Sequence, residues 1–192
     1  METRDAILNS AERLIQAKGY SGFSFQDIAE EVGIRKASIY YHFPVKGDLG
    51  RAVVARYRDR MRAHFDRLPA ASADDFWPLF DSYLGPIMDF GRSTGLACLS
   101  GVMGGEYLNL PSELQSELKA FFMEHEEFLT DLLERGRAAG QYRFAGEARQ
   151  MARLLFSTIE GALLIKRIKG DETYVGQLFQ HVSRMLGRAN PA

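Results

Sequence analysis

Apolar residues recur at helical spacing along almost the whole chain. In residues 3–19, Ile7, Ala11, Leu14 and Ile15 fall at positions i, i+4, i+7 and i+8, which lie on one face of a helix. The same spacing predicts longer helices over about residues 46–68, 74–92, 112–137, 146–168 and 172–187. It also predicts two short helices, one that follows Ser24 and carries Phe25, Ile28, Ala29 and Val32, and one that carries Ile39, Tyr40 and Phe43 and ends at Pro44. In the Gly-rich residues 91–105, Leu96, Leu99 and Met103 still fit a helical face. No segment alternates apolar and polar residues as a strand does, so the sequence predicts an all-α chain of about nine helices.

Glycine and proline residues indicate where several of these helices end. Gly33 interrupts the second apolar segment, and Gly140 and Gly170 separate the last three helices. Pro86 lies inside the helix predicted over 74–92, where its missing N–H is expected to kink or break the helix.

The composition is that of an ordinary globular protein. Of 192 residues, 46% are hydrophobic and 26% are charged, and the chain contains one Cys. Collagen-like, disordered and disulfide-stapled classes are therefore excluded. The first residues include acidic side chains and no long apolar run, and no segment reaches the roughly 18 apolar residues that a membrane span needs. We expect no membrane partner, and a reducing cytoplasm as the compartment.

The most informative segment is FSFQDIAEEVGIRKASIYYHFPVKGDL, residues 23–49. It predicts a helix, a four-residue turn and a second helix: Ala29 permits close approach, Gly33 gives the turn its backbone freedom, and Ile34 and Ile39 fill the space between the helices. The second helix then exposes basic, hydroxyl and aromatic groups, which bind phosphates and read base edges in a major groove. Spacing alone is also compatible with a surface helical hairpin whose basic face is solvated.

Within this segment, DIAEEVGIRKASIYYHFPVKGDL resembles the helix-turn-helix signature of the tetracycline-repressor (TetR/AcrR) family of bacterial transcription regulators. The resemblance is specific over about residues 4–50, and the rest of the chain matches in length, helix count and layout. It implies an N-terminal three-helix DNA-binding domain (residues 1–48) and a C-terminal ligand-binding and dimerisation domain (residues 49–192). It also implies a homodimer whose partners are a double-stranded DNA operator and a small-molecule effector, and we expect no cofactor.

Nine residues are expected at the DNA-binding site from this resemblance. They are Ser24, Arg35, Lys36, Ala37, Ser38, Tyr40, Tyr41, His42 and Lys46. Ser24 would cap the first motif helix and touch a phosphate, and Lys46 would meet backbone phosphate. Arg35 stands where a small Ser or Thr is common in the family, which predicts an altered base preference. Val45 replaces the usual Ser N-cap, which predicts a loose start of the next helix.

Charge is unevenly distributed along the chain. The formal net charge is −1, but residues 35–62 carry eight basic residues against two acidic ones, and residues 63–192 carry thirteen against seventeen. Because phosphate attraction depends on local potential, near-neutrality of the whole chain does not exclude DNA. The arginines between Arg56 and Arg62 are expected to be mostly solvated or paired with acids rather than in contact with DNA.

Large, adaptable apolar residues are concentrated in the middle of the chain. The resemblance implies an effector pocket among helices 46–68, 74–92, 112–137 and 146–168. The candidate effector-binding residues are Tyr57, Met61, Trp77, Phe80, Cys98, Met103, Tyr107, Phe128, Phe156 and Glu160. Their size favours an apolar or aromatic effector, and Glu160 either anchors a polar group of it or pairs with an Arg. Ordinary core packing is the alternative for each of the aromatic residues.

Cys98, in the segment GLACLSGVMGGEY, raises a separate question. Some repressors of this family carry a Gly-x-x-Cys-Leu-type segment here, and in some of them the Cys senses electrophiles or oxidants. A sensor thiol needs a depressed pKa and access to reagents. Leu96 and Leu99 flank Cys98, and a small buried core thiol is the favoured interpretation.

No metal site and no enzyme active site are predicted. The four histidines are scattered singly, without metal-ligand spacing. The sequence contains no phosphate-binding Gly-rich loop, and no Ser/His/Asp or Cys/His set that its context supports.

An apolar stripe on the helix over 146–168 continues on the helix over 172–187. The candidate dimer-interface residues are Leu154, Leu155, Ser157, Gly161, Ala162, Leu178, Phe179 and Val182. Two such helices from each subunit would form a four-helix bundle, whereas the alternative is packing inside one subunit. A dimer would place two recognition helices about 34–36 Å, or a multiple of that, apart, which implies a palindromic operator.

The sequence therefore predicts a homodimeric repressor that a small apolar or aromatic effector releases from a palindromic operator. Two alternatives remain: a repressor that senses electrophiles or oxidants through Cys98, and a ligand-independent regulator or activator with the same DNA-binding domain.

Overall fold

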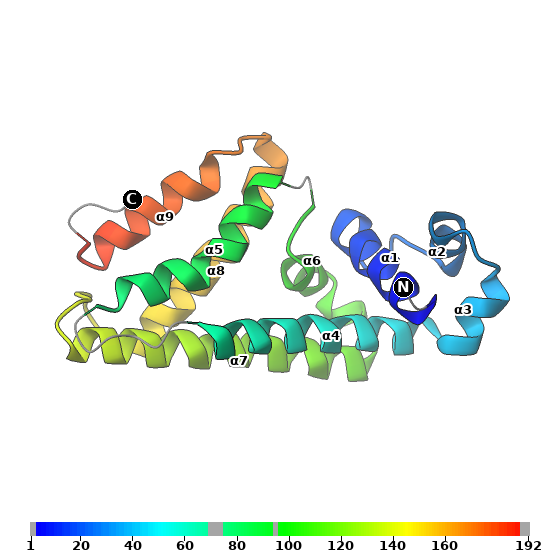
Figure 1. Cartoon of the computed structure of the whole chain (residues 1–192), viewed down its shortest axis with the longest axis horizontal. Helices are drawn as coiled ribbons and strands as arrows, with labels where there is room; N and C mark the ends of the chain where they lie inside the picture. The colour runs from blue at the N-terminus through cyan, green and yellow to red at the C-terminus, as the bar shows by residue number, and fades with distance from the viewer. Residues whose placement is uncertain (1–2, 69–74, 94–95, 189–192) are drawn as a thin grey trace. The chain divides into compact units, whose positions relative to one another are not determined.

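A computed structural model describes residues 3–68, 75–93 and 96–188 (Figure 1). These residues form nine α-helices and a short 3-10 helix, η1. In chain order they are α1 (Thr3–Lys18), α2 (Phe25–Val32), α3 (Lys36–His42), α4 (Lys46–Arg67), α5 (Trp77–Ser93), α6 (Leu99–Gly105), η1 (Tyr107–Asn109), α7 (Ser112–Ala138), α8 (Ala148–Lys169) and α9 (Tyr174–Met185). The predicted all-α chain of about nine helices is confirmed. The start predicted at residue 74 lies outside the described residues.

Helix α5 runs through Pro86 without a break. A residue with an N–H at position 86 would donate to the carbonyl of Ser82, and proline removes that bond. Instead, His64 Nε2 lies 3.2 Å from this carbonyl oxygen and supplies the missing donor. A side chain from α4 thus satisfies the carbonyl that the proline leaves without its helical donor, and the expected break is absent.

The chain folds into two compact units, and the first comprises described residues 3–62 and 96–121. In it, α1 packs against α2, α3 and α6, and α2 packs against α3. The fully buried side chains include Ile7, Leu8, Ile15, Ile28, Ile39, Leu49, Leu99, Met103 and Leu114. The predicted boundary between the DNA-binding domain (residues 1–48) and the ligand-binding and dimerisation domain (residues 49–192) falls within helix α4. This division stays a prediction.

The second unit comprises described residues 63–68, 75–93 and 122–188. Helix α9 packs against both α5 and α8. The core is rich in aromatic rings, and Tyr142 is fully buried with its hydroxyl donating to the Phe76 carbonyl at 2.8 Å. Burial, which disfavours the phenolate, raises the pKa of Tyr142.

None of the described helices is both long and apolar enough to cross a membrane.

Candidate DNA-binding site

Helix α2 begins at a complete capping box. The Ser24 hydroxyl oxygen accepts the Gln26 N–H at 3.2 Å. In return, the Asp27 carboxylate accepts the Ser24 N–H at 2.8 Å and the Ser24 hydroxyl at 2.7 Å. These bonds, together with nearby Lys18, hold the pKa of Asp27 well below its ordinary value. The predicted Ser24 cap is confirmed, whereas the reciprocal role of Asp27 was not predicted.

The turn between α2 and α3 depends on Gly33. This residue adopts φ +73° and ψ +34°, and its N–H and that of Ile34 both donate to the Ala29 carbonyl at 3.0 Å. A left-handed backbone strains residues that carry a Cβ, so glycine suits this position. Arg35 follows with extended angles (φ −78°, ψ 146°) and stands just before α3 as its N-cap residue.

Helix α3 is fixed by one face and presents the other to solvent. Ile39 is fully buried and Phe43, just after the helix, is 3% exposed. The Tyr40 ring lies edge-on to the Phe25 ring, with centroids 5.0 Å apart. Tyr41, on the opposite face, is 84% exposed. An exposed large aromatic residue on a short, firmly packed helix is available to a partner.

The nine predicted DNA-binding residues all lie at this motif or at the start of α4. The exposed ones are Ser24, Arg35, Lys36, Ala37, Tyr40 and Tyr41, and the half-buried ones are Ser38, His42 and Lys46. Eight of these nine residues precede α4, and their solvent-facing groups include a guanidinium, an ammonium and phenolic hydroxyls.

Lys46 is directed into the first unit. Its ammonium donates to the Phe23 carbonyl and lies 4.2 Å and 4.8 Å from the ring centroids of Phe23 and Tyr20. Burial lowers the pKa of Lys46, while attraction to Glu106 and to Asp27 opposes that shift. In this conformation Lys46 secures the segment before α2, and its contact with a DNA phosphate stays a prediction.

The four arginines of α4 from Arg56 to Arg62 are paired with acids, as expected. Glu12 of α1 accepts from both Arg56, at 3.0 Å, and Arg60. Arg58 pairs with Glu117 of α7, and Arg62 lies 3.8 Å from Asp59. These pairs neutralise much of the basic charge counted on α4, whereas Arg35 and Lys36, at the start of α3, are exposed.

The exposed face of α3 has the chemistry to read DNA. A seven-residue helix is about 10 Å long and fits a major groove. Lys36 and Arg35 can donate to phosphates or to guanine acceptors, and Tyr41 and His42 can reach base edges. The geometry is that of a recognition helix held by a preceding helix and a tight turn.

Comparison with known proteins agrees with this geometry. Residues 7–53 match the family described as bacterial regulatory proteins, tetR family, and residues 78–182 match the tetracyclin repressor-like C-terminal domain. The chain belongs to the TetR family. It is a DNA-binding transcriptional regulator and not an enzyme.

Three relatives of this TetR-family protein match it over nearly their whole length. The HTH-type transcriptional repressor NemR of Escherichia coli is 24% identical over all of this chain and 96% of NemR. The crystal structure of a TetR-family regulator from Agrobacterium tumefaciens is 34% identical, with a TM-score of 0.88 over 95% of this chain and 96% of that one. A TetR regulator from Legionella pneumophila is 31% identical, with a TM-score of 0.86 over 97% and 98%.

The ten candidate effector residues are divided equally between the two units. Tyr57, Met61, Cys98, Met103 and Tyr107 belong to the first, and Trp77, Phe80, Phe128, Phe156 and Glu160 belong to the second. In the second unit, Phe128 stacks on Phe65 and Tyr83, with centroids 4.3 Å and 5.3 Å apart. The Phe156 ring stacks on the buried ring of His125, with centroids 5.0 Å apart. The spacing of the sequence did not predict this contact. Trp77 meets Phe80 edge-on at 5.8 Å.

Cys98 is buried at the start of α6, with 8% of its surface exposed. Its Sγ lies 3.0 Å from the Ser100 hydroxyl oxygen and 3.7 Å from the Tyr57 hydroxyl oxygen. Among the candidate effector residues of the first unit, the structure thus brings Cys98 and Tyr57 together. The burial agrees with the interpretation of Cys98 as a core thiol.

The candidate dimer residues point in two directions. Leu155, Ala162, Phe179 and Val182 are buried inside the second unit. Leu154 and Ser157 are exposed, and Gly161 and Leu178 are half-buried. A separate line of residues on α8, the α8 stripe, faces solvent and comprises Leu154, Ser157, Gly161, Leu164, Ile165 and Ile168. The spacing of the sequence did not show which apolar face of α8 each residue occupies.

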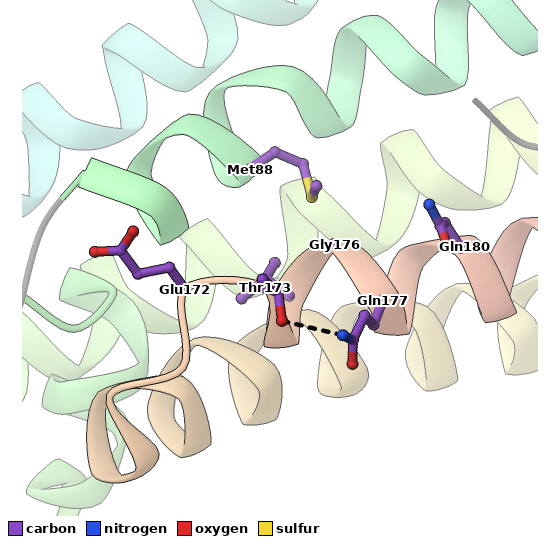
Figure 2. Close-up of a pocket in the computed structure, with 7 residues that line it drawn as sticks. Met88, Glu172, Thr173, Gly176, Gln177 and Gln180 are labelled. Atoms are coloured by element: carbon purple, nitrogen blue, oxygen red, sulfur yellow. Dashed lines mark hydrogen bonds between the residues drawn. The ribbon is translucent and has the colours of Figure 1, made fainter.

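A pocket of about 390 Å³ lies beside the start of α9 (Figure 2). Met88 of α5 lines it together with Glu172, Thr173, Val175, Gly176, Gln177 and Gln180. The Gln177 amide donates to the Thr173 hydroxyl oxygen at 3.0 Å. None of the ten candidate effector residues lines this pocket. In the described part of the chain, no three His, Cys, Asp or Glu side chains are grouped to hold a metal ion.

Proposed function

We propose that this TetR-family protein is a homodimeric repressor that binds a palindromic operator and is released by a small apolar or aromatic effector. The observation that carries the proposal is the arrangement of α3, where Ile39 and Tyr40 anchor the helix while Tyr41 and Lys36 remain exposed. The repressor NemR, similar over the whole chain, supports repression rather than activation.

The α8 stripe supports dimerisation by a second copy of this chain. Leu154, Leu164 and Ile168 are 50%, 52% and 77% exposed, and they recur at the spacing of a helix–helix seam. At Gly161, a Cβ would meet no neighbouring atom within 4 Å, so the helix backbone is open to close approach here. Two copies related by a two-fold axis would bury these side chains against each other and pair two α3 helices.

The aromatic residues of the second unit support an apolar or aromatic effector. The Phe128 ring stacks on the rings of both Phe65 and Tyr83. Such aromatic rings bind flat apolar ligands. An effector acts only if it binds the DNA-free arrangement more tightly than the DNA-bound one, and such coupling is typically about 1–3 kcal/mol.

Cys98 supports a second candidate, release by an electrophile or oxidant. The NemR crystal structure, 22% identical with a TM-score of 0.81, is described as a reduced form. In this chain Cys98 lies at the start of α6 within reach of two hydroxyl groups. The burial of the thiol is the observation against this candidate.

Selection of DNA by the purified protein tests the proposal. A random duplex pool is bound, recovered and sequenced over several rounds, at moderate salt. We expect enrichment of an inverted repeat whose half-sites are about one or two helical turns apart. A pool that shows no enrichment, or a single half-site without symmetry, contradicts a dimeric repressor. The enriched duplex then serves to screen apolar and aromatic compounds for release.

A further inference from the structure

Glu106 connects the end of α6 to the turn before the DNA-binding motif. It follows α6 directly and precedes η1, and its backbone is held on both sides: its N–H donates to the Met103 carbonyl at 3.1 Å, and its carbonyl accepts the Asn109 N–H at 2.8 Å. Helix α6 is itself packed on α1, where the Ala97 N–H donates to the Gln16 carbonyl at 3.3 Å. The backbone from which the Glu106 side chain extends is therefore held in place by hydrogen bonds.

The carboxylate of Glu106 binds Ser21, 85 residues earlier in the chain. The Ser21 N–H donates to Glu106 Oε2 at 2.9 Å, and the Ser21 hydroxyl donates to the same oxygen. Ser21 lies in the turn between α1 and α2, where its N–H has no helical partner. A charged acceptor makes such bonds stronger than a neutral one does.

Gly19 leaves room for this carboxylate. It adopts φ +84°, and a Cβ added to it would lie 2.2 Å from Glu106 Oε1. A residue with a Cβ at this position would be strained by the backbone angle and would force the Glu106 carboxylate to shift. The turn thus has the shape that the Glu106 carboxylate requires.

The same turn carries the groups that fix the recognition motif. Two residues after Ser21, the Phe23 carbonyl accepts from Lys46, and the next residue, Ser24, caps α2. The Glu106 carboxylate also attracts the Lys46 ammonium. A shift of Ser21 would therefore displace the residues that hold the start of α2 and the start of α4.

We infer that Glu106 is a positioning residue for operator binding: through Ser21 it holds the α1–α2 turn, and with it α2 and α3, in the arrangement that reads DNA. The inference rests on the proposed function, and Glu106 itself does not touch the nucleic acid. Loss of its carboxylate lowers affinity for the operator, which needs two correctly placed α3 helices. Binding to random-sequence DNA, which depends on charge rather than on the placement of α3, is not weakened by removal of this negative charge.

The test compares two DNA probes by fluorescence anisotropy, well below the unfolding temperature. The probes are the duplex enriched by the wild-type protein and a scrambled duplex of equal length. Glu106→Ala is expected to weaken binding to the enriched duplex about tenfold, as loss of a charged hydrogen bond does, without weakening binding to the scrambled duplex. Glu106→Gln removes the same charge but keeps an oxygen that accepts from the Ser21 N–H, and is expected to lie closer to the wild type.

Further variants test whether Glu106 acts on DNA binding through Ser21. Ser21→Ala should have a smaller effect than Glu106→Ala, and adding it to Glu106→Ala should cause no further loss, because both act through one contact. Glu127→Gln, which removes an exposed negative charge on α7, is the control and should match the wild type. Hydrogen exchange at the Ser21 amide should be faster in Glu106→Ala than in the wild type.

Several results would overturn the inference. They are unchanged affinity of Glu106→Ala for the enriched duplex, an equal loss on both probes, full additivity with Ser21→Ala, and unchanged exchange at the Ser21 amide. A wild-type protein that prefers no duplex would overturn the proposed function as well, and it would be recognised before any variant is measured.

Discussion

The Tyr40 ring packs edge-on against the Phe25 ring at a centroid distance of 5.0 Å, whereas the adjacent residue, Tyr41, is 84% exposed. Successive residues on a helix point about 100° apart, so one of two neighbouring tyrosines anchors α3 while the other faces outward. The two residues therefore contribute differently to stability and to DNA binding, although both belong to the predicted DNA-binding set.

Tyr41→Ala is expected to weaken operator binding by about 1–3 kcal/mol, the usual size of a base contact, and to leave the unfolding temperature nearly unchanged. Tyr40→Ala removes the ring pair with Phe25 and should cost about 0.5–1.5 kcal/mol of unfolding free energy as well. Thermal unfolding and anisotropy on the same samples separate the two effects. Equal operator affinity of Tyr41→Ala and wild type would show that the outward face of α3 is not the reading face.

The capping box of α2 makes the stability of the first unit depend on pH. Ser24→Ala should destabilise the protein by about 1 kcal/mol, as loss of an N-cap usually does. The folded pKa of Asp27 lies below its unfolded value, so its contribution is complete above pH 5 or so and is lost as the pH falls further. In urea unfolding, the difference between wild type and Asp27→Asn should be constant from about pH 6 to 8 and shrink below pH 4. A difference that grows on acidification contradicts the assignment.

The α8 stripe predicts where a charged substitution would disrupt the proposed dimer. Ile168→Glu places a carboxylate at a 77% exposed position and should shift the protein from dimer to monomer, with little change in secondary structure. Met123→Glu, at a 52% exposed apolar position on α7, is the matched control and should remain dimeric. Sedimentation velocity distinguishes the species. An Ile168→Glu protein that still sediments as a dimer would place the interface elsewhere.

The burial of Cys98 predicts slow reaction with thiol reagents. The native protein should react with a maleimide far more slowly than the same protein in denaturant, because only 8% of the residue is exposed. Ser100→Ala and Tyr57→Phe, which remove the two neighbouring hydroxyls, should leave the native rate slow. Rapid labelling of the native wild type, with loss of operator binding, would instead favour the sensing alternative.

Local signals were sufficient to predict most of the fold. Ser24 starts α2, Gly33 ends it, and apolar residues at helical spacing predict the buried faces, as Ile39 shows. These features act within a few residues of one another, so a single sequence contains them. The recognition helix could be placed for the same reason, and the family resemblance added the role of its exposed side chains.

Contacts between distant residues could not be predicted in the same way. The pairing of Glu12 with Arg56 and Arg60, and of Glu106 with Ser21, joins segments about 44 to 85 residues apart, which no periodicity reveals. The His64 side chain at the Ser82 carbonyl similarly explains why Pro86 does not break α5. On α8, the pattern identified apolar positions but not which of its two apolar faces each occupies, so the candidate dimer residues Leu154, which is exposed, and Leu155, which is buried, could not be told apart.

The most direct test of a dimeric repressor compares the enriched palindrome with a duplex in which one half-site is scrambled. Anisotropy titrations with the wild-type protein at about 150 mM salt, and at one lower salt concentration, give both affinities. We predict that the intact palindrome is bound at least about thirtyfold more tightly, because specific binding exceeds non-specific binding by about 4–10 kcal/mol and scrambling one half-site removes about half of that difference. Equal affinity for the two duplexes would contradict the central claim.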